Sequence, residues 1–140
     1  MEILAEAVSD APPERVFALL AAGDRWQEWA GPMVPRSRWE VSGEPEGAVG
    51  AVRRLGVGPF VSRERITAHE APRRLCYVVD SPAPYRDYRS EVTLTRTAEG
   101  GTAVRWASSF EPRVPGTGRL LAWFLQRVVA GFARNLARRA

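Results

Sequence analysis

The chain has 140 residues, 45% of them hydrophobic, which suits one domain with a sizeable buried core. All 20 basic residues are arginine, so no lysine is present to form a Schiff base with a substrate. One cysteine, Cys76, and one histidine, His69, are too few for a disulfide or for a zinc site built from these residues. We therefore expect a single domain over residues 1–140, without a metal or another cofactor.

The net charge of +4 comes from arginines that are spread along the chain instead of forming a block. This spread argues against a nucleic-acid partner, because nucleic-acid-binding proteins gather basic residues on one surface. No segment approaches the roughly 18 consecutive apolar residues of a membrane span, and the first residues lack the basic-then-apolar order of a signal peptide. We expect a cytoplasmic protein with no integral membrane segment.

The first third of the chain predicts one strand and two short helices. Residues 2–8 alternate in polarity and are followed by two prolines, which is typical of a strand that leads into a helix. That helix is expected over about residues 13–22. Asp24 can then cap a second, shorter helix over residues 25–30.

The middle of the chain is expected to be all strand, because short apolar segments are separated by Gly- and Pro-containing turns and show no helical period. In the last two segments, apolar and polar residues alternate, as in an antiparallel sheet with one buried face. Strands are expected over residues 38–42, 48–55, 61–69, 74–80, 88–97 and 102–111.

The C-terminal segment, residues 116–139, carries apolar side chains at helical spacing for about six turns. A helix of this length would be ~35 Å long and would cover the buried face of the sheet. The sequence thus predicts an α+β fold with a curved, seven-stranded antiparallel sheet, two short helices and a long C-terminal helix. The apolar stripe of that helix is Leu121, Phe124, Leu125, Val128, Phe132 and Leu136.

Several segments, in this order, match a known pattern. They are residues 11–20 (APPERVFALL), 24–29 (DRWQEW), 47–50 (GAVG), 64–75 (ERITAHEAPRRL) and 100–106 (GGTAVRW). Together with the order of elements, they resemble the START/Bet v 1-like superfamily, also called the SRPBCC group, and within it the bacterial polyketide cyclase/dehydrase-like branch. The likeness covers nearly the whole chain.

The resemblance implies a helix-grip fold in which the long helix closes a deep apolar cavity against the sheet. In different members, this cavity carries lipids, binds hormones or secondary metabolites, or cyclises and dehydrates polyketides. The resemblance implies no single reaction, because no fixed set of catalytic residues accompanies the fold. The site therefore has to be inferred from the residues of this chain.

Strand alternation turns one row of side chains toward the interior, opposite the C-terminal helix, while the second short helix is expected near the cavity entrance. Apolar walls with a few hydroxyl groups suit a hydrophobic ligand. The alternative is that these side chains simply fill the core. The expected ligand-binding residues are Trp26, Trp29, Met33, Phe60, Ser90, Trp106, Ser108, Phe110, Phe124 and Val128.

Strand phase also places Glu64 in the interior, where an unpaired carboxylate is costly. We expect Arg54, on the neighbouring strand, to be its partner. Such a pair would orient a ligand or, with Tyr88, take part in acid–base chemistry, and a structural ion pair is the alternative. The catalytic residues stay unassigned beyond these three candidates.

Trp123 lies on the arginine side of the last helix, away from the apolar stripe. It is expected either to stack on the neighbouring arginines or to form part of a homodimer or partner surface.

Three functions remain open. The favoured one is binding or transport of a hydrophobic small molecule, a lipid or a polyketide-like metabolite, because the residues supply a cavity lining. The second is a cyclase/dehydrase acting on polyketide-like substrates, although no Ser/His/Asp or Cys/His arrangement is present. The third is a protein-interaction module that works through the basic C-terminal helix.

Overall fold

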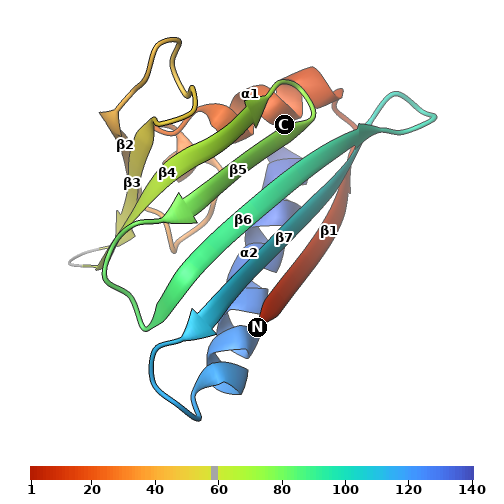
Figure 1. Cartoon of the computed structure of the whole chain (residues 1–140). Coiled ribbons are helices and arrows are strands. Elements are labelled where there is room, and N and C mark those ends of the chain that lie inside the picture. The colour runs from red at the N-terminus through yellow and green to blue at the C-terminus, as the bar shows by residue number, and fades with distance from the viewer. Residues whose placement is uncertain (58–59) are drawn as a thin grey trace.

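The computed structural model describes residues 1–57 and 60–140, but not the side chains of Val57 and Phe60. Figure 1 shows one layer of strands, with the long helix α2 behind it and α1 across one end. The elements are β1 (Glu2–Ser9), α1 (Pro13–Ala21), the 3₁₀ helix η1 (Trp26–Glu28), β2 (Arg36–Val41), β3 (Val52–Val57), β4 (Phe60–Glu70), β5 (Arg74–Val79), β6 (Tyr85–Arg96), β7 (Thr102–Pro112) and α2 (Gly118–Arg139).

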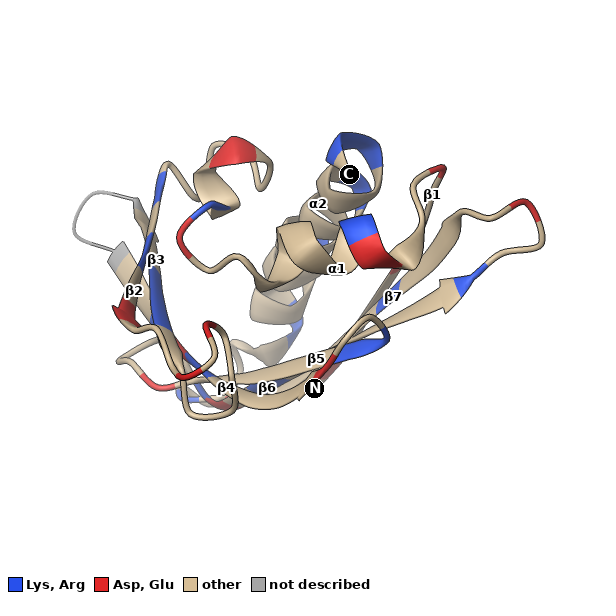
Figure 2. Cartoon of the chain, turned by 90° about the horizontal axis from the view of Figure 1, so that it is seen from above, with Lys and Arg blue, Asp and Glu red and all other residues tan. Residues whose placement is uncertain are grey.

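The strands form one seven-stranded sheet in the order β1-β7-β6-β5-β4-β3-β2, and all neighbours are antiparallel. Consecutive strands from β2 to β7 are neighbours, and β1 closes the far edge by pairing with β7. The sheet curves, so that its β2–β3 end rises beside the helices (Figure 2). The predicted helix-grip architecture is therefore confirmed.

Some predicted boundaries are wrong. β3 begins at Val52 and not at residue 48, because residues 48–51 form a turn in which Gly50 has a φ of 95°. The Gly50 N–H donates to the Ile66 carbonyl at 2.9 Å, so the turn is held against β4. The second short helix is a single 3₁₀ turn that ends at Glu28.

α2 packs on β1 and β7 through one stripe of buried side chains. Leu125, Val129, Ala133 and Leu136 form this stripe at i, i+4 and i+3 spacing. On the same helix, Gln126 uses both ends of its amide: Nε2 donates to the Leu4 carbonyl at 2.8 Å, and Oε1 accepts from the Leu4 N–H at 3.3 Å. This side chain therefore supplies hydrogen bonds to the backbone of the edge strand β1.

Replacing Leu136 by Ala tests the packing of α2 on the sheet. Leu136 is fully buried, so the substitution should lower the free energy of unfolding by about 2–5 kcal/mol through lost burial and the cavity left behind. Leu120→Ala is the matched control, because Leu120 is 71% exposed on the same helix and should change stability by less than about 0.5 kcal/mol. Urea unfolding measures both; equal losses would contradict this assignment of the buried face.

Candidate functional site

A buried ion pair between β3 and β4 is the most unusual polar feature of the interior. Arg53 and Glu64 face each other in the strand register, and their residues are 0% and 7% exposed. Arg53 Nε donates to Glu64 Oε1 at 3.0 Å, and Nη2 also lies 3.0 Å from that oxygen. Ser62 Oγ donates to the other carboxylate oxygen at 3.1 Å. The pair is electrically neutral as a unit.

The predicted partner of Glu64 was wrong by one residue. Arg54 lies on the opposite face of β3, where its side chain is 37% exposed and pairs with Glu40 at 3.1 Å. The error came from taking the strand phase from Val52, an apolar residue that is buried on that outer side. Arg53 alternates with Ala51 and Leu55, which belong to the core, and this alternation was the signal in the sequence.

Aromatic rings cover the buried guanidinium of Arg53. Its Cζ lies 4.3 Å from the Trp26 ring centroid and 4.6 Å from the Tyr77 ring centroid. Such contacts are attractive because the π face of an aromatic ring is electron-rich, and they are strongest where water is excluded. Glu64 and these two rings together compensate for the loss of hydration of Arg53.

Trp26 is also the centre of a larger aromatic cluster. Its ring centroid lies 4.6 Å from Trp29, 5.9 Å from Trp106 and 5.5 Å from Phe132. Trp26 lies in η1, Trp29 follows η1, Trp106 is on β7 and Phe132 is on α2. The cluster therefore connects the sheet to η1 and to α2. Phe132 is partly exposed, whereas the three tryptophans are buried.

Several buried N–H groups in this region have no hydrogen-bond partner within the described part of the chain. They are Arg53 Nη1, Trp29 Nε1 and Trp106 Nε1, whereas Arg53 Nη2 has the Glu64 carboxylate 3.0 Å away. By contrast, Trp26 Nε1 donates to the Leu20 carbonyl at 3.0 Å. Because buried polar groups in native proteins are almost always paired, these unpartnered donors call for an explanation.

A group of hydroxyls lies further along the interior, on β6 and β7. Ser90 and Ser108 face each other across the two strands, with their Oγ atoms 2.6 Å apart. Tyr88 is buried beside them. Burial raises the pKa of the Tyr88 phenol, and hydrogen bonds with Ser108 and Ser90 oppose that shift. The Tyr88 ring stacks on Phe110 with centroids 6.4 Å apart.

α2 presents a second, partly exposed apolar stripe beside the one that packs on the sheet. Leu121, Phe124, Val128 and Phe132 form it, and Phe124 is 45% exposed. Phe132 reaches the aromatic cluster, so this stripe leads from the surface to the buried tryptophans. Phe124 and Val128 therefore do not lie in the packed interior. Met33, after η1, is likewise 45% exposed.

A pocket of about 690 Å³ opens at the end of the sheet near the β5–β6 loop. Tyr85 and Tyr88 line it together with loop residues. Arg113 fastens this loop, because its Nε donates to the Ala83 carbonyl at 3.0 Å and its N–H to the Pro84 carbonyl at 3.0 Å. The pocket therefore adjoins the part of the interior that contains Tyr85 and Tyr88.

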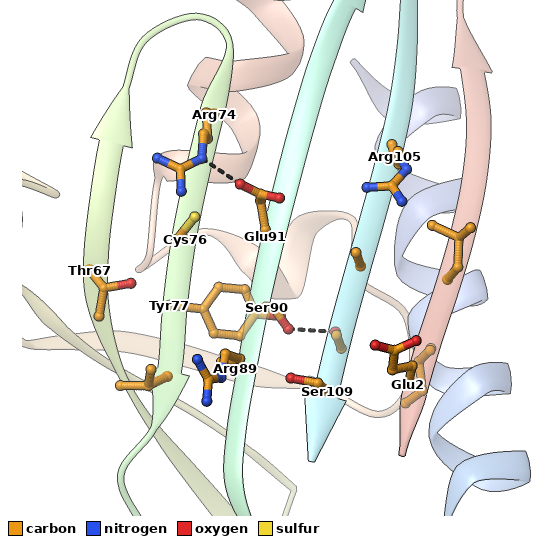
Figure 3. A pocket seen from close by; sticks show the side chains of 15 residues that line it. Glu2, Thr67, Arg74, Cys76, Tyr77, Arg89, Ser90, Glu91, Arg105 and Ser109 are labelled. Atoms are coloured by element: carbon orange, nitrogen blue, oxygen red, sulfur yellow. Dashed lines mark hydrogen bonds and ion pairs between the residues drawn. The ribbon is translucent and has the colours of Figure 1, made fainter.

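A second hollow, of about 720 Å³, involves the face of the sheet turned away from α2 (Figure 3). Charged side chains line it, among them Arg74, Arg89, Arg105 and Glu91, and Arg74 Nε donates to Glu91 Oε2 at 2.5 Å. Cys76 also lies here, and burial raises the pKa of its thiol. Ile3, Tyr77, Val78 and the Ser90–Ser108 pair also border it, so its lining combines charged, hydroxyl and apolar side chains.

The remaining sequence expectations concern metals, membranes and His69. In residues 1–57 and 60–140, no group of three or more His, Cys, Asp or Glu side chains could hold a metal ion. No helix of that part is long and apolar enough to cross a membrane. His69 Nδ1 lies 2.7 Å from the Gly47 carbonyl oxygen and its ring packs edge-on against Phe17.

The expected ligand-binding residues separate into groups. Trp26, Trp29 and Trp106 meet in the aromatic cluster, and Ser90, Ser108 and Phe110 surround Tyr88. The side chain of Phe60 lies outside the described residues. Four residues that the structure places around these groups were not among the expected site residues: Arg53, Tyr77, Tyr85 and Phe132. Tyr77 was identifiable from its alternation with Leu75 on β5, but nothing in the sequence signalled the contact of Phe132 with the tryptophans.

Comparison with known proteins agrees with this architecture. A family model described as polyketide cyclase/dehydrase and lipid transport matches residues 2–140. A START superfamily protein from Mycobacterium smegmatis superposes with a TM-score of 0.82 at 10% identity, covering 97% of this chain and 94% of that one. The XoxI protein from Bacillus cereus gives 0.79 at 19% identity, with 97% and 92% covered. The structure of an Aha1 dimer from Colwellia psychrerythraea gives 0.70 at 15% identity, with 98% and 96% covered.

At these identities the structural similarity defines the fold alone. No curated protein matches the sequence significantly.

The ionisation of Glu64 should leave a signature in the pH dependence of stability. Burial raises the pKa of this carboxyl above its ordinary value of 4.5, and Arg53 opposes the shift without cancelling it. The folded protein therefore holds the proton more tightly than the unfolded chain does. This contribution to stability is present below pH 4.5 and is lost as the pH rises through the raised value. In Glu64→Gln, the fall in stability with rising pH above 4.5 should be shallower than in the native protein.

Urea unfolding at a series of pH values measures these slopes. Glu40→Gln is the control, since Arg63 lowers the pKa of the exposed Glu40 carboxyl and its contribution changes in the opposite direction, below pH 4.5. Parallel curves for the native protein and Glu64→Gln above pH 4.5 would contradict a raised pKa for Glu64.

Proposed function

Because the chain belongs to the polyketide cyclase/dehydrase and lipid transport family, we propose that it binds a hydrophobic small molecule, a lipid or a polyketide-like metabolite, between α2 and the sheet. The observation that carries this proposal is the partly exposed apolar stripe of α2, which leads to a buried aromatic cluster with unpartnered N–H donors. Apolar walls with a few oriented polar groups are the usual composition of small-molecule sites. A cytoplasmic location is part of the proposal.

Phe132 is the natural point of access to the interior. Of the rings in the aromatic cluster, it is the one with partial exposure, and its centroid lies 5.5 Å from Trp26, 6.5 Å from Trp29 and 5.8 Å from Trp106. A rotamer change of one partly exposed side chain is a fast and inexpensive motion compared with displacement of a helix. Ligand entry past Phe132 therefore leaves the fold intact.

A cyclase/dehydrase activity is the alternative that the family also suggests. The observation in its favour is the buried Glu64 carboxyl, whose pKa is raised by burial and which lies in the interior with Tyr77 and Arg53. A raised pKa makes a carboxyl a better proton donor at a given pH than an ordinary one, because more of it stays protonated. Binding is placed first because Glu64 already accepts hydrogen bonds from Arg53 and Ser62.

Filling the middle of the apolar stripe, at the half-buried Val128, tests the binding proposal. Val128→Trp should weaken the affinity for the apolar fluorescent probe N-phenylnaphthylamine by at least about tenfold, which corresponds to about 1.4 kcal/mol, because the larger ring occupies ligand space. Arg134→Trp places the same ring at an exposed position of α2 and should leave the affinity unchanged. Fluorescence titration measures both. Unchanged affinity in Val128→Trp would exclude this stripe from the site.

A second surface of α2 favours contact with a protein partner. Trp123 is 60% exposed and stacks on Arg127, whose Cζ lies 5.3 Å from the ring centroid, so the expected stacking is confirmed. Leu120 beside it is 71% exposed. α2 contains five arginines and no acidic residue, and Figure 2 shows blue segments along it. This surface therefore suits a partner with an acidic face.

The homodimer expected as one option through Trp123 stays a prediction, although one structural relative is described as a dimer. Like charges on two facing copies of α2 oppose self-association. Sedimentation velocity at low salt, where this repulsion is little screened, should therefore show a monomer. A dimer that Trp123→Ala abolishes, and that the exposed control Val8→Ala retains, would contradict this expectation and establish the homodimer instead.

A further inference from the structure

We infer that the ligand carries a neutral carbonyl oxygen, as in a ketone or an ester, and that Arg53, Trp29 and Trp106 donate hydrogen bonds to it. This inference rests on the proposed binding function and specifies the chemical class of the ligand. It starts from the unpartnered groups, which are all donors: Arg53 Nη1, Trp29 Nε1 and Trp106 Nε1. An arginine and an indole have no acceptor to offer, so the complementary ligand atom is an acceptor.

These donors belong to side chains grouped around one ring. Arg53, Trp29 and Trp106 each contact Trp26, at 4.3, 4.6 and 5.9 Å. Because Trp26 and Tyr77 cover the guanidinium and Glu64 occupies its Nε–Nη2 edge, the remaining approach is at Nη1. The three side chains therefore surround one ring, at the place where β3, β7 and the segment after η1 meet, and the inferred acceptor lies beside that ring.

The charge of the site selects between a neutral and an anionic acceptor. Arg53 and Glu64 already neutralise each other, and both are almost completely buried. A carboxylate would add an uncompensated negative charge beside Glu64, which is costly in an interior without water. A carbonyl oxygen satisfies the donors without adding charge. An alcohol is less suitable, because its own hydrogen also needs an acceptor.

The hydrogen-bond donors are inaccessible in the ligand-free arrangement, since none of these nitrogen atoms has exposed surface. Movement of Phe132, the partly exposed ring of the cluster, opens the approach from α2. The apolar body of the ligand then lies along Leu121, Phe124 and Val128, with its carbonyl end inward. The ligand is thus expected to be amphipathic in a specific sense: apolar along most of its length, with an acceptor at one end.

Three probes of nearly equal size separate these possibilities: acetylnaphthalene, ethylnaphthalene and naphthoate, all substituted at the same ring position. We expect acetylnaphthalene to bind the native protein about tenfold more tightly than ethylnaphthalene, as one or two hydrogen bonds to buried donors provide, and naphthoate to bind most weakly. Isothermal titration calorimetry measures the affinities. The carbonyl stretching band of bound acetylnaphthalene should also shift to lower frequency than in hexane.

Variants assign the effect to individual donors. Trp106→Phe removes one N–H without changing the charge and should reduce the ketone's advantage over the hydrocarbon to about threefold or less. Arg53→Gln should remove it almost completely, whereas Arg54→Gln, next to it but on the outer face, should have no effect. Glu64→Gln leaves Arg53 uncompensated, so naphthoate should become the tightest of the three. Trp106→Phe and the infrared band keep the test valid if the charge variants fail to fold.

The outcomes distinguish the inference from the function on which it rests. Equal binding of all three probes, or tightest binding of naphthoate to the native protein, would overturn the inference while leaving hydrophobic binding in place. No binding of any probe would overturn the proposed function itself. An advantage of the ketone that persists in Trp106→Phe and Arg53→Gln would show that the donors are elsewhere.

Discussion

A guanidinium without exposed surface remains in a protein interior only where its charge is balanced and its faces are covered, and this constraint organises the interior here. Glu64 balances the charge of Arg53 through the register of β3 and β4, while the Trp26 and Tyr77 rings pack against its guanidinium. Trp26 must therefore be placed accurately. Its backbone N–H donates to Ser37 Oγ at 2.9 Å and its indole to the Leu20 carbonyl at 3.0 Å, which ties the η1 turn to both β2 and α1.

The two apolar stripes of α2 separate its packing on the sheet from the ligand contact that we propose. One stripe, with Leu125, Val129 and Leu136, is buried against β1 and β7 and fixes the helix on the sheet. The neighbouring stripe is left partly exposed and reaches the aromatic cluster through Phe132. Because separate faces carry the two tasks, a side chain of the second stripe can move without loosening the first. Arg53 and Glu64 then supply the polar end of the proposed site, and the second stripe of α2 supplies its apolar side.

Much of the fold was predictable from the sequence, because strand alternation and the helical period depend on local residue order. The site was less accessible to such reasoning. Val52 is apolar and buried, yet on the outer side of β3, so taking the phase from it exchanged Arg54 for Arg53. The apolar positions of α2 also did not reveal which stripe packs on the sheet, since both have helical spacing and the choice depends on where β1 and β7 lie. Register and relative placement of distant elements are tertiary properties.

The central claim is that the unpartnered donors around Trp26 receive the polar end of an apolar ligand. The most direct measurement is a crystal structure of the protein grown with acetylnaphthalene. We predict density between α2 and the sheet, with Phe132 in a new rotamer and the carbonyl oxygen within hydrogen-bonding distance of an Arg53 Nη atom. Density for the probe in the charged hollow on the outer face of the sheet, with the aromatic cluster unchanged, would contradict the account.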